Sequence, residues 1–378
     1  MKVYWYWPYI RDELLALARA IPDTGDDEVV VHAMAGRLAG ADTSGPGWRV
    51  AATLPAVAPR DEGSMRWAAS RATTYLGQAR ARRTLLRDEP FDVAHVMFLN
   101  YFVDAFDLRA VGKRQPLVVS VHDVVPHQSR VPGTVERALL GRQYTAANTI
   151  VVHHESVRAR LVAEFAVDPA RVHNVPHWVI PAPAEPRARP SASPQILFFG
   201  ALRRNKGVDV LLDAFAALPD RDLRLVVAGR GATDVEQEVR DAAARDPRVV
   251  AEIGFVAEAR KHELFRASDL VVLPYTEFSS QSGVLHDAYA HHRPVVVTDV
   301  GALGESVRDD GSGWVVPARD AEALAETLTT ALANGEAWTR AAAHAGSVGL
   351  DRSPDATARR LRAVYAAAAA HSPHAPQT

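Results

Sequence analysis

Short apolar segments alternate with longer helical patterns along most of the chain, in two series that a Pro- and Ala-rich stretch separates. The segments of the first series are residues 3–7, 29–33, 50–54, 93–98, 117–121 and 149–152, and those of the second are residues 195–199, 223–228, 249–253, 270–273, 295–298 and 313–316. Repeated strand, helix and strand units are the pattern of a doubly wound parallel sheet. We therefore predict an α/β fold with two Rossmann-like parallel-sheet domains that face each other across a cleft.

The stretch between the two series sets the predicted domain boundaries. Residues 181–194, PAPAEPRARPSASP, are rich in proline and alanine and lack periodicity, which indicates an interdomain linker. The predicted parts are an N-terminal domain over residues 1–181, a linker over 182–194 and a C-terminal domain over 195–354. A final helical pattern at residues 355–370 follows a break at Ser353 and Pro354, and we expect it to pack back onto the N-terminal domain.

The composition excludes several classes of protein. The 378 residues suffice for two domains with their own cores, and 48% apolar and 23% charged residues are typical of a soluble globular protein. A net charge of −2 predicts no general attraction to nucleic acid. The chain has no cysteine, which excludes disulfides and thiol catalysis. The sequence shows no long uncharged apolar run and no signal peptide, so we expect a cytoplasmic protein.

The second series contains a polar loop at which we predict a ligand site. Between segments 270–273 and 295–298 the chain passes through this loop and enters a helix at Ser282 and Gly283. Such a loop lies at the carboxyl edge of a parallel sheet, where these sheets bind ligands. Free N–H groups at the positive end of the helix dipole hold a phosphate, and Asp287 is placed one turn later to bind an attached ribose. The alternative is an ordinary polar loop with a capped helix.

A second loop, after the strand predicted at residues 195–199, carries a pair of cations. Gly200 permits a sharp turn, Arg203 offers a planar fork of donors and Lys206 offers a mobile point charge. This pairing is suited to a diphosphate. Solvated loop cations are the alternative, but Lys206 is one of only four lysines in the chain and the predicted helix start lies on the same sheet edge. The sequence therefore favours phosphate binding.

Five blocks of the second half occur in the order typical of one enzyme family. They are FFGALRRNKGVDVLLDAFAAL, VVAGRG, EIGFVAEARKHELFRASDLVVLPY, QSGVLHDAYAHHRPVVVTDVGALGE and GSGWVVPARDAEALAE. On these blocks the chain resembles, from residue 196 to about residue 324, the nucleotide-sugar domain of the retaining GT-B glycosyltransferases of family 4. In the N-terminal half the resemblance rests only on VSVHDVVPH and VPHWVI.

The resemblance implies a reaction and a separate binding role for each domain. A sugar would pass from a nucleotide diphosphate donor, with UDP, GDP or dTDP as the nucleotide, to a hydroxyl of a small-molecule, glycan or lipid-linked acceptor. The anomeric configuration would be retained. The N-terminal domain would bind the acceptor and the C-terminal domain the nucleotide sugar. No cofactor is implied beyond this co-substrate.

By position, the resemblance places the diphosphate between the cationic loop and the helix start. Arg203 and Lys206 would stabilise negative charge on the departing diphosphate, and the backbone amides of Ser282, Gly283 and Val284 would assist. Charge accumulates on the leaving phosphate as the glycosidic bond breaks, so cations preorganised there act most strongly in the transition state.

The resemblance also implies the rest of the donor site. Asp287 would take the place of the ribose-binding glutamate of the family, and the base is expected around Phe255 and Val256. His122, at the end of an N-terminal strand and followed by Asp123, matches the cleft histidine of the family, which contacts the transferred sugar. The alternative for His122 is a core or capping histidine.

Several positions depart from the pattern of the family. Ala201 stands where the family has an arginine, so charge neutralisation would fall on Arg203. The paired glutamates of the family become Ser279 and Asp287, while Glu277 can replace the first and Gln281 is near. We therefore expect Glu277, Ser279 and Gln281 near the donor sugar.

The first predicted strand ends in aromatic residues, WYWPY, where the family has a glycine-rich loop. Without glycine the backbone cannot approach a ligand as closely, but aromatic faces stack on sugar rings. Trp7 is therefore an acceptor-site hypothesis. The alternative is a buried aromatic core.

A basic segment extends from Arg66 to Arg87. It contains six arginines, no aspartate or glutamate, and apolar residues between the arginines. On a helix this pattern gives a basic face beside an apolar face, which is suited to peripheral contact with an anionic membrane or to an acidic acceptor. A solvated helix is the alternative.

The sequence predicts no metal site. The pairs His153–His154 and His291–His292 lack a carboxylate partner at metal-ligand spacing, and the only Asp-x-Asp is residues 220–222, in a predicted turn. Two other functions stay open. One is a sugar-nucleotide epimerase or hydrolase, for which Glu277, His122 and Asp123 would serve as acid and base. The other is a non-catalytic nucleotide-sugar-binding protein.

Overall fold

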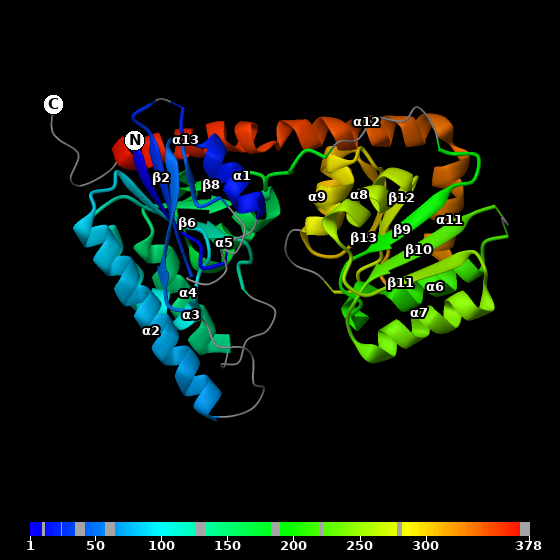
Figure 1. Cartoon of the computed structure of the whole chain (residues 1–378), viewed down its shortest axis with the longest axis horizontal. Helices are drawn as coiled ribbons and strands as arrows, with labels where there is room; N and C mark the ends of the chain where they lie inside the picture. The colour runs from blue at the N-terminus through cyan, green and yellow to red at the C-terminus, as the bar shows by residue number, and fades with distance from the viewer. Residues whose placement is uncertain are drawn as a thin grey trace. The chain divides into compact units, whose positions relative to one another are not determined.

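A computed structural model describes most of the chain. The described residues are 1–9, 12–23, 25–34, 42–56, 65–125, 133–182, 190–219, 222–277 and 282–370. The chain forms two compact units, each with one sheet (Figure 1). Unit 1 contains Met1–His177 and Pro354–Thr378, and unit 2 contains Trp178–Ser353. The chain thus enters unit 2 at Trp178, ahead of the predicted boundary at residue 181.

The sheet of unit 1 has the strand order β3-β4-β2-β1-β5-β6-β7-β8. The strands are β1 (Lys2–Tyr6), β2 (Glu28–Met34), β3 (Ser44–Gly45), β4 (Trp48–Leu54), β5 (Val93–Val96), β6 (Leu117–Val121), β7 (Thr149–Val152) and β8 (Val172–Asn174). Strand pairs are parallel, except that β3 pairs with β4 in antiparallel orientation. The strand order reverses between β1 and β5, the position at which doubly wound sheets bind ligands.

Helices cover both faces of this sheet. They are α1 (Asp12–Ala20), α2 (Met65–Asp88), α3 (Tyr101–Gly112), α4 (Gly133–Ala146), α5 (Glu155–Phe165) and α13 (Pro354–Ala370), with a short 3-10 helix, η1, at Pro169–Arg171. Side chains alternate between the faces of a strand. Tyr4 and Tyr6 accordingly join the apolar cluster that α3 and α4 complete, while Trp5 points the other way and its Nε1 donates to Tyr365 Oη of α13 at 2.9 Å. The final helix therefore closes one face of unit 1.

The sheet of unit 2 is fully parallel in the order β11-β10-β9-β12-β13-β14. The strands are β9 (Gln195–Phe199), β10 (Arg224–Gly229), β11 (Val249–Ile253), β12 (Leu270–Leu273), β13 (Val295–Thr298) and β14 (Gly313–Val316). The order reverses between β9 and β12, and the loops after these two strands are the two loops singled out from the sequence. The predicted α/β fold with two parallel-sheet domains is therefore confirmed.

The helices of unit 2 form a layer on each face of the sheet, with α6 and α7 on one face and α8 and α9 on the other (Figure 1). They are α6 (Val208–Ala216), α7 (Thr233–Arg245), α8 (Glu258–Ala267), α9 (Gly283–Ala290), α10 (Ala302–Asp310), α11 (Ala321–Ala333) and α12 (Gly335–Asp351), with a 3-10 helix, η2, at Arg204–Lys206. Phe198 belongs to the first layer and the adjacent Leu197 to the second. This alternation explains why β9 reads as a continuous apolar run.

The segment that leads into β9 is fixed to the core of unit 2 by one carboxylate. Asp269, directly before β12, accepts hydrogen bonds from the Ser191 amide at 2.8 Å, from Ser191 Oγ at 2.7 Å and from the Gln195 amide at 2.8 Å. The end of the predicted linker is therefore held against unit 2. Residues 183–189 of that segment lie outside the described residues.

Candidate functional site

A pocket of about 500 Å³ opens at the carboxyl ends of β9, β10 and β11. Its lining residues are Phe199, Gly200, Ala201, Arg203, Gly229, Arg230, Gly231, Glu236, Gly254, Phe255 and Val256. The volume is in the range of pockets that hold small-molecule ligands. The pocket thus brings together Gly200, Arg203, Phe255 and Val256 of the predicted nucleotide site.

Glycine shapes the mouth of this pocket. The chain turns away from the sheet at Gly229 with a φ of 145°, and a Cβ atom there would lie 1.8 Å from the carbonyl oxygen of Gly200. Only glycine combines this backbone conformation with so close an approach. The ends of β9 and β10 therefore meet backbone to backbone, which leaves no room for a side chain between them.

The cationic loop after β9 packs against the loop after β12. A Cβ atom on Gly207, whose φ is 65°, would lie 1.9 Å from the carbonyl oxygen of Pro274. The amide of Thr276 donates to the carbonyl oxygen of Asn205 at 3.0 Å. Lys206 is therefore held beside the loop that leads into α9.

Lys206 lies over an aromatic ring at the start of α9. Its Nζ is 3.5 Å from the centroid of Tyr275, and Tyr275 Oη is 3.2 Å from Ser282 Oγ at the N-cap of α9. Burial, with the charge of Arg203 as a second cause, lowers the pKa of Lys206 to about 8. A bound anion would offset both effects. The structure therefore brings Arg203, Lys206 and Ser282 to one corner of unit 2.

The helix start predicted at Ser282 and Gly283 is present, since Ser282 is the N-cap and α9 begins at Gly283. Val284 faces the pocket loop, because its Cγ2 is 3.4 Å from the position of a Cβ atom on Gly200. The first amides of a helix have no intrahelical acceptor, and Ser282 is buried. The α9 N-terminus is thus placed beside the cationic loop.

The carboxylate predicted to bind a ribose has a cationic neighbour that sequence reasoning missed. Asp287 Oδ1 lies 3.1 Å from Nζ of Lys261 on α8, and Lys261 also contacts Glu258 at 2.6 Å. These carboxylates raise the pKa of Lys261 despite its burial. The scarcity of lysine was the available signal, but the pairing of α8 with α9 could not be read from the chain. Lys261 therefore positions Asp287.

The predicted donor-sugar residues are described only in part. Glu277 Oε1 pairs with the guanidinium of Arg319 at 3.0 Å, and both side chains are mostly exposed. Such exposed pairs contribute little to stability, so Glu277 is available to a ligand. Ser279 and Gln281 lie outside the described residues.

Arg230 is a pocket residue that sequence reasoning also missed. It stands between Gly229 and Gly231 directly after β10, and its guanidinium carbon is 5.9 Å from the ring centroid of Phe255. The ring of Phe255 is 80% exposed. With a cation beside it, this exposed ring offers a face on which a flat ligand group can stack.

In unit 1, the sequence-predicted residues lie at the carboxyl edge of the sheet. His122 follows β6, its Nε2 is 3.0 Å from the carbonyl oxygen of Met97, and burial lowers its pKa. The ring centroids of Trp7 and His122 are 6.3 Å apart. Trp7 is half-buried, whereas Trp5 and Tyr6 are buried. The alternative of an aromatic core therefore holds for Trp5 and Tyr6, while Trp7 lies at the sheet edge with His122 and the half-buried Asp123.

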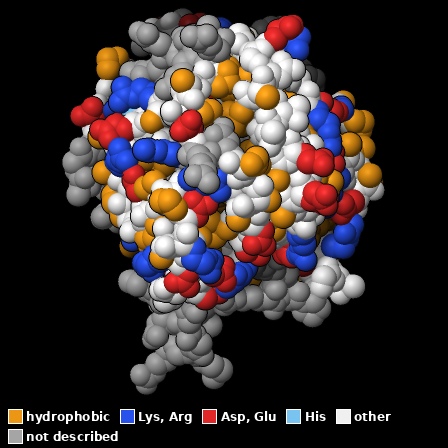
Figure 2. All heavy atoms as spheres, turned by 90° about the vertical axis from the view of Figure 1, so that its right-hand side faces the viewer, with side chains coloured by type: hydrophobic (Ala, Val, Ile, Leu, Met, Phe, Trp, Pro, Cys, Tyr) orange, Lys and Arg blue, Asp and Glu red, His pale blue; other side chains and the backbone are white. Residues whose placement is uncertain are grey.

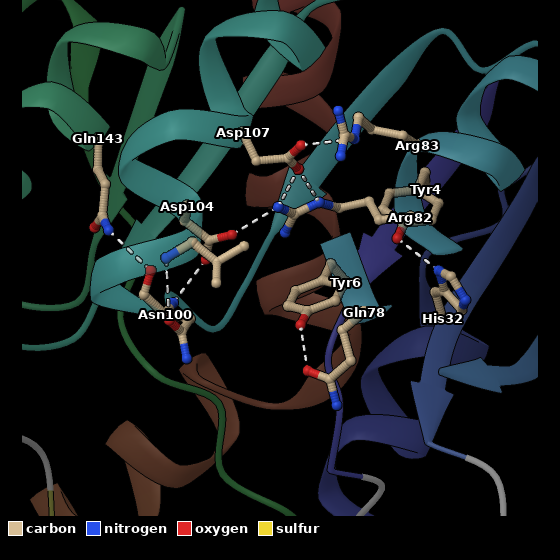
Figure 3. A network of polar contacts seen from close by, with 11 residues as sticks. Tyr4, Tyr6, His32, Gln78, Arg82, Arg83, Asn100, Asp104, Asp107 and Gln143 are labelled. Atoms are coloured by element: carbon tan, nitrogen blue, oxygen red, sulfur yellow. Dashed lines mark hydrogen bonds and ion pairs between the residues drawn. The ribbon is translucent and has the colours of Figure 1, made fainter. Parts of the chain in front are cut away.

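The basic segment lies on helix α2, but one of its arginines does not face solvent. Arg82 of α2 points into unit 1 and is fully buried, between Asp104 and Asp107 of α3 (Figure 3). Arg83 Nε lies 3.0 Å from Asp107 Oδ1 as well. A buried arginine requires such partners, because an unpaired charge in the interior is costly. The prediction of a uniform basic face from Arg66 to Arg87 was therefore wrong for Arg82.

Neither a metal-binding cluster nor a membrane-spanning helix is found in the described residues. In the part of the chain that the structure describes, no group of three or more His, Asp or Glu side chains is arranged to hold a metal ion. No helix in the same residues is long and apolar enough to cross a membrane. On the face seen in Figure 2, basic and acidic side chains are interspersed among apolar ones.

Comparisons with known proteins identify the family. Residues 14–182 match the family model "Glycosyltransferase Family 4", and residues 193–334 match "Glycosyl transferases group 1". A D-inositol 3-phosphate glycosyltransferase from Xylanimonas cellulosilytica is 33% identical over 287 aligned positions, and the match covers 68% of this chain and 68% of its own. The chain is a family 4 glycosyltransferase.

Other relatives of this glycosyltransferase match over shorter stretches. A phosphatidyl-myo-inositol mannosyltransferase from Mycobacterium leprae is 33% identical over 38% of this chain and 39% of its own. A GDP-mannose:glycolipid 4-beta-D-mannosyltransferase from Xanthomonas campestris is 30% identical over 53% of this chain and 55% of its own. The chain thus spans about half the length of these two relatives or less.

Solved structures extend the likeness in fold over nearly the whole glycosyltransferase. Sucrose-phosphate synthase from Thermosynechococcus elongatus superposes with a TM-score of 0.73 at 18% identity, over 98% of this chain and 100% of that chain. Anabaena Alr3699/HepE in complex with UDP superposes with a TM-score of 0.69 at 15% identity, over 97% and 100%. These neighbours establish the GT-B fold.

Proposed function

We propose that this glycosyltransferase moves a sugar from a nucleotide diphosphate to a hydroxyl of a small-molecule, glycan or lipid-linked acceptor, with retention of anomeric configuration and without a metal or cofactor. The observation that carries the proposal is the meeting of Arg203, Lys206 and the N-terminus of α9 beside the pocket of unit 2. Two side-chain cations and a helix N-terminus together suit one diphosphate.

The charges explain how the site would act on the reaction. Negative charge grows on the diphosphate as the bond to the sugar breaks, and cations already fixed there need no reorganisation. Lys206 is partly buried and its pKa is about 8, so it is mainly protonated at pH 7. An anion beside it raises that pKa and keeps the charge in place. Each such contact is worth roughly 3 kcal/mol in the transition state.

Each of the remaining groups would bind a different part of the substrates. Phe255, with Arg230 beside it and Val256 next to it, offers a face on which the base stacks. Asp287, positioned by Lys261, accepts hydrogen bonds from the ribose. Of the other predicted residues, His122, Asp123 and Trp7 of unit 1 would contact a sugar or the acceptor, and Glu277 of unit 2 would contact the donor sugar.

The relatives suggest which substrates to try first. Two relatives are named for inositol 3-phosphate or phosphatidyl-myo-inositol, and a third is named for GDP-mannose. One structural neighbour was solved in complex with UDP. We therefore propose UDP- or GDP-linked hexoses as donors and a phosphorylated cyclitol or a glycolipid as acceptors.

We further propose that the enzyme is cytoplasmic and makes peripheral contact with an anionic membrane. Two stripes of exposed side chains with helical spacing support this contact. The stripe on α2 consists of Leu76, Arg80, Arg83 and Arg87. The stripe on α3 consists of Phe102, Phe106 and Arg109, with Lys113 at the C-cap. The two helices pack against each other, and Phe106 is 64% exposed. Exposed phenylalanine beside several cations is suited to an anionic lipid surface.

The experiment that tests the proposal starts from the nucleotide. Thermal shift with UDP, GDP and dTDP identifies the base, and donors with that base are then incubated with and without an acceptor panel. Nucleotide release that depends on the acceptor supports transfer. Release with water alone indicates a hydrolase, isomerisation without release indicates an epimerase, and binding without turnover indicates a binding protein. Each of these last three results would overturn the proposal.

A further inference from the structure

Three imidazoles gather at the carboxyl edge of the unit 1 sheet. The ring centroid of His153, which follows β7, lies 4.8 Å from that of His122 and 5.4 Å from that of His177, and the last two are 6.4 Å apart. Only His122 belongs to the site predicted from the sequence. The carboxyl edge of a parallel sheet is where such folds bind ligands.

The backbone contacts define which nitrogen of each ring carries the proton. His153 Nδ1 lies 2.8 Å from the carbonyl oxygen of Val175, and His122 Nε2 lies 3.0 Å from the carbonyl oxygen of Met97. A carbonyl oxygen only accepts, so each of these two nitrogens donates. In the neutral ring the other nitrogen, Nε2 of His153 and Nδ1 of His122, then carries a lone pair and accepts.

The accepting nitrogen of His153 is buried. The residue is 7% exposed, and no hydrogen-bond partner for Nε2 occurs among the described residues. A buried polar atom without a partner costs about 1–3 kcal/mol, so most such atoms have one. This cost is consistent with a partner that arrives with a substrate.

The charge state of His153 selects the kind of partner. Burial, and then the neighbouring His122 and His177, keep the pKa of His153 well below its usual value, so the ring is neutral at pH 7. A neutral imidazole nitrogen accepts from a hydroxyl or binds a metal, whereas an oxyanion requires donors. No arrangement of three metal-ligating side chains exists in the described part of the chain. A hydroxyl group therefore fits best.

We propose that His153 accepts a hydrogen bond from a hydroxyl group of a sugar or cyclitol, at a polyol-binding site that His122 and His177 complete. The substrate class rests on the proposed sugar transfer, while binding of a polyol does not depend on turnover. His153 thereby determines specificity, because a substrate without a hydroxyl at that point leaves Nε2 buried and unpaired.

Nitrogen NMR of the full chain labelled with 15N-histidine tests the proposal directly. The probes are myo-inositol, glucose, mannose and inorganic phosphate, each with and without saturating UDP or GDP, and His153→Leu assigns the His153 signals. We expect a polyol to shift the Nε2 resonance of His153 in the direction of an accepted hydrogen bond, with the ring still neutral. Protonation of His153 by inorganic phosphate would show an anion site instead. Absence of a response to all three polyols would also overturn the proposal.

Kinetics with the substrates found in the nucleotide and acceptor screens provide the second readout. His153→Leu is expected to raise the KM of the hydroxyl-bearing substrate about tenfold, the loss of one hydrogen bond, with nucleotide Kd unchanged. His153→Gln, which places an amide oxygen near the former Nε2, should restore most of the affinity. His173→Leu, a half-buried histidine of β8 outside the cluster, is the matched control and should leave KM unchanged.

The outcomes separate this proposal from the proposed function. If transfer is absent but a polyol shifts the His153 signal, the polyol site stands without the reaction. If transfer occurs and neither His153 variant changes a KM, the polyol-site proposal is refuted and the proposed transfer reaction is retained. Should His153→Leu fail to fold, the glutamine variant and the spectra of the unaltered protein decide.

Discussion

The two units share a doubly wound parallel sheet, but the carboxyl edges of their sheets are built from different material. In unit 2 a glycine with positive φ stands at or directly after the end of β9, β10 and β11, namely Gly200, Gly229 and Gly254, so backbone lines much of the pocket. In unit 1 the corresponding edge carries the side chains of Trp7, His122 and His153. Backbone groups and fixed cations can bind the phosphates that all nucleotide sugars share. Aromatic and histidine side chains, as in unit 1, can select one particular ligand. The difference also explains why the five sequence blocks that resemble the family all lie in unit 2, although a family model matches each unit.

The largest effect is expected inside unit 1, at the ion pair that joins α2 to α3. Arg82→Ala leaves Asp104 buried without its cation and Asp107 with only Arg83, which should lower the free energy of unfolding by about 3–5 kcal/mol. Urea denaturation measures the loss. The exposed neighbour gives the control, because Arg80→Ala should change stability by less than about 0.5 kcal/mol. Equal effects would show that this side-chain network does not hold unit 1 together.

Lys206 tests whether unit 2 acts on the transition state. Lys206→Ala should lower kcat about a hundredfold, equivalent to roughly 3 kcal/mol, with much less change in donor binding. Steady-state kinetics with the identified donor provide the measurement, and Arg245→Ala, an exposed arginine of α7, provides the control. A rise in KM alone would refute the transition-state role.

The pH dependence of the same residue sharpens this test. The lowered pKa of Lys206, about 8, means that the free enzyme loses the charge as the pH rises through that value. We expect kcat/KM to fall above pH 8, and Lys206→Arg to move this fall to higher pH because a guanidinium stays charged. A profile that is the same in both proteins would assign the fall to another group.

The two glycines Gly229 and Gly254 separate backbone conformation from close approach. Their φ angles are 145° and 146°, but a Cβ atom would meet the Gly200 carbonyl only at Gly229 and nothing within 4 Å at Gly254. Gly229→Ala should therefore cost about 1–3 kcal/mol of stability more than Gly254→Ala. Thermal unfolding compares the two. Equal losses would mean that the approach of β9 and β10 is not what requires glycine.

His122 tests the reading of unit 1. His122→Ala should reduce transfer about tenfold or more while the Kd of UDP or GDP stays nearly unchanged, because the proposed nucleotide site lies in unit 2. Calorimetry and acceptor-dependent kinetics give the two numbers. If both decline equally, the residue belongs to the nucleotide site or to the core.

The smallest effect concerns the membrane. Replacing Phe102 and Phe106 by serine removes two exposed aromatic rings and should weaken binding to anionic vesicles about tenfold. Sedimentation with vesicles of anionic and of neutral lipid measures the partition. Leu350→Ser removes an equally exposed side chain from unit 2 and should have no effect. If vesicle binding changes neither with salt concentration nor with lipid charge, the proposed contact is excluded.

The sequence correctly predicted the features that depend on residues close together in the chain. Segments 195–199, 249–253, 270–273 and 295–298 are the strands β9, β11, β12 and β13, and the helix start at Ser282 is where the sequence indicated it. The loop with Gly200 and Lys206 was readable because its glycines and cations lie close together in the chain. The strands β3 and β8 were not predicted, because two or three residues give no periodicity.

What the sequence did not predict depends on contacts between distant residues. Arg82 looked solvent-exposed because Asp104 and Asp107, its partners, are on another helix. Lys261 pairs with Asp287 across two helices, and His153 meets His122 and His177 only where three strands end. A charge pattern along one helix shows which residues are basic, but which of them are buried depends on the neighbouring helix.

The position of α13 has a consequence for biosynthesis. This helix follows all of unit 2 in the chain, yet Tyr365 hydrogen-bonds to Trp5 and Arg362 donates to the carbonyl oxygens of Ala20 and Ile21. While the ribosome is still translating, the N-terminal sheet is exposed on the face that this helix will cover. Unit 2 can therefore finish folding first, and the half synthesised earliest reaches its native state last.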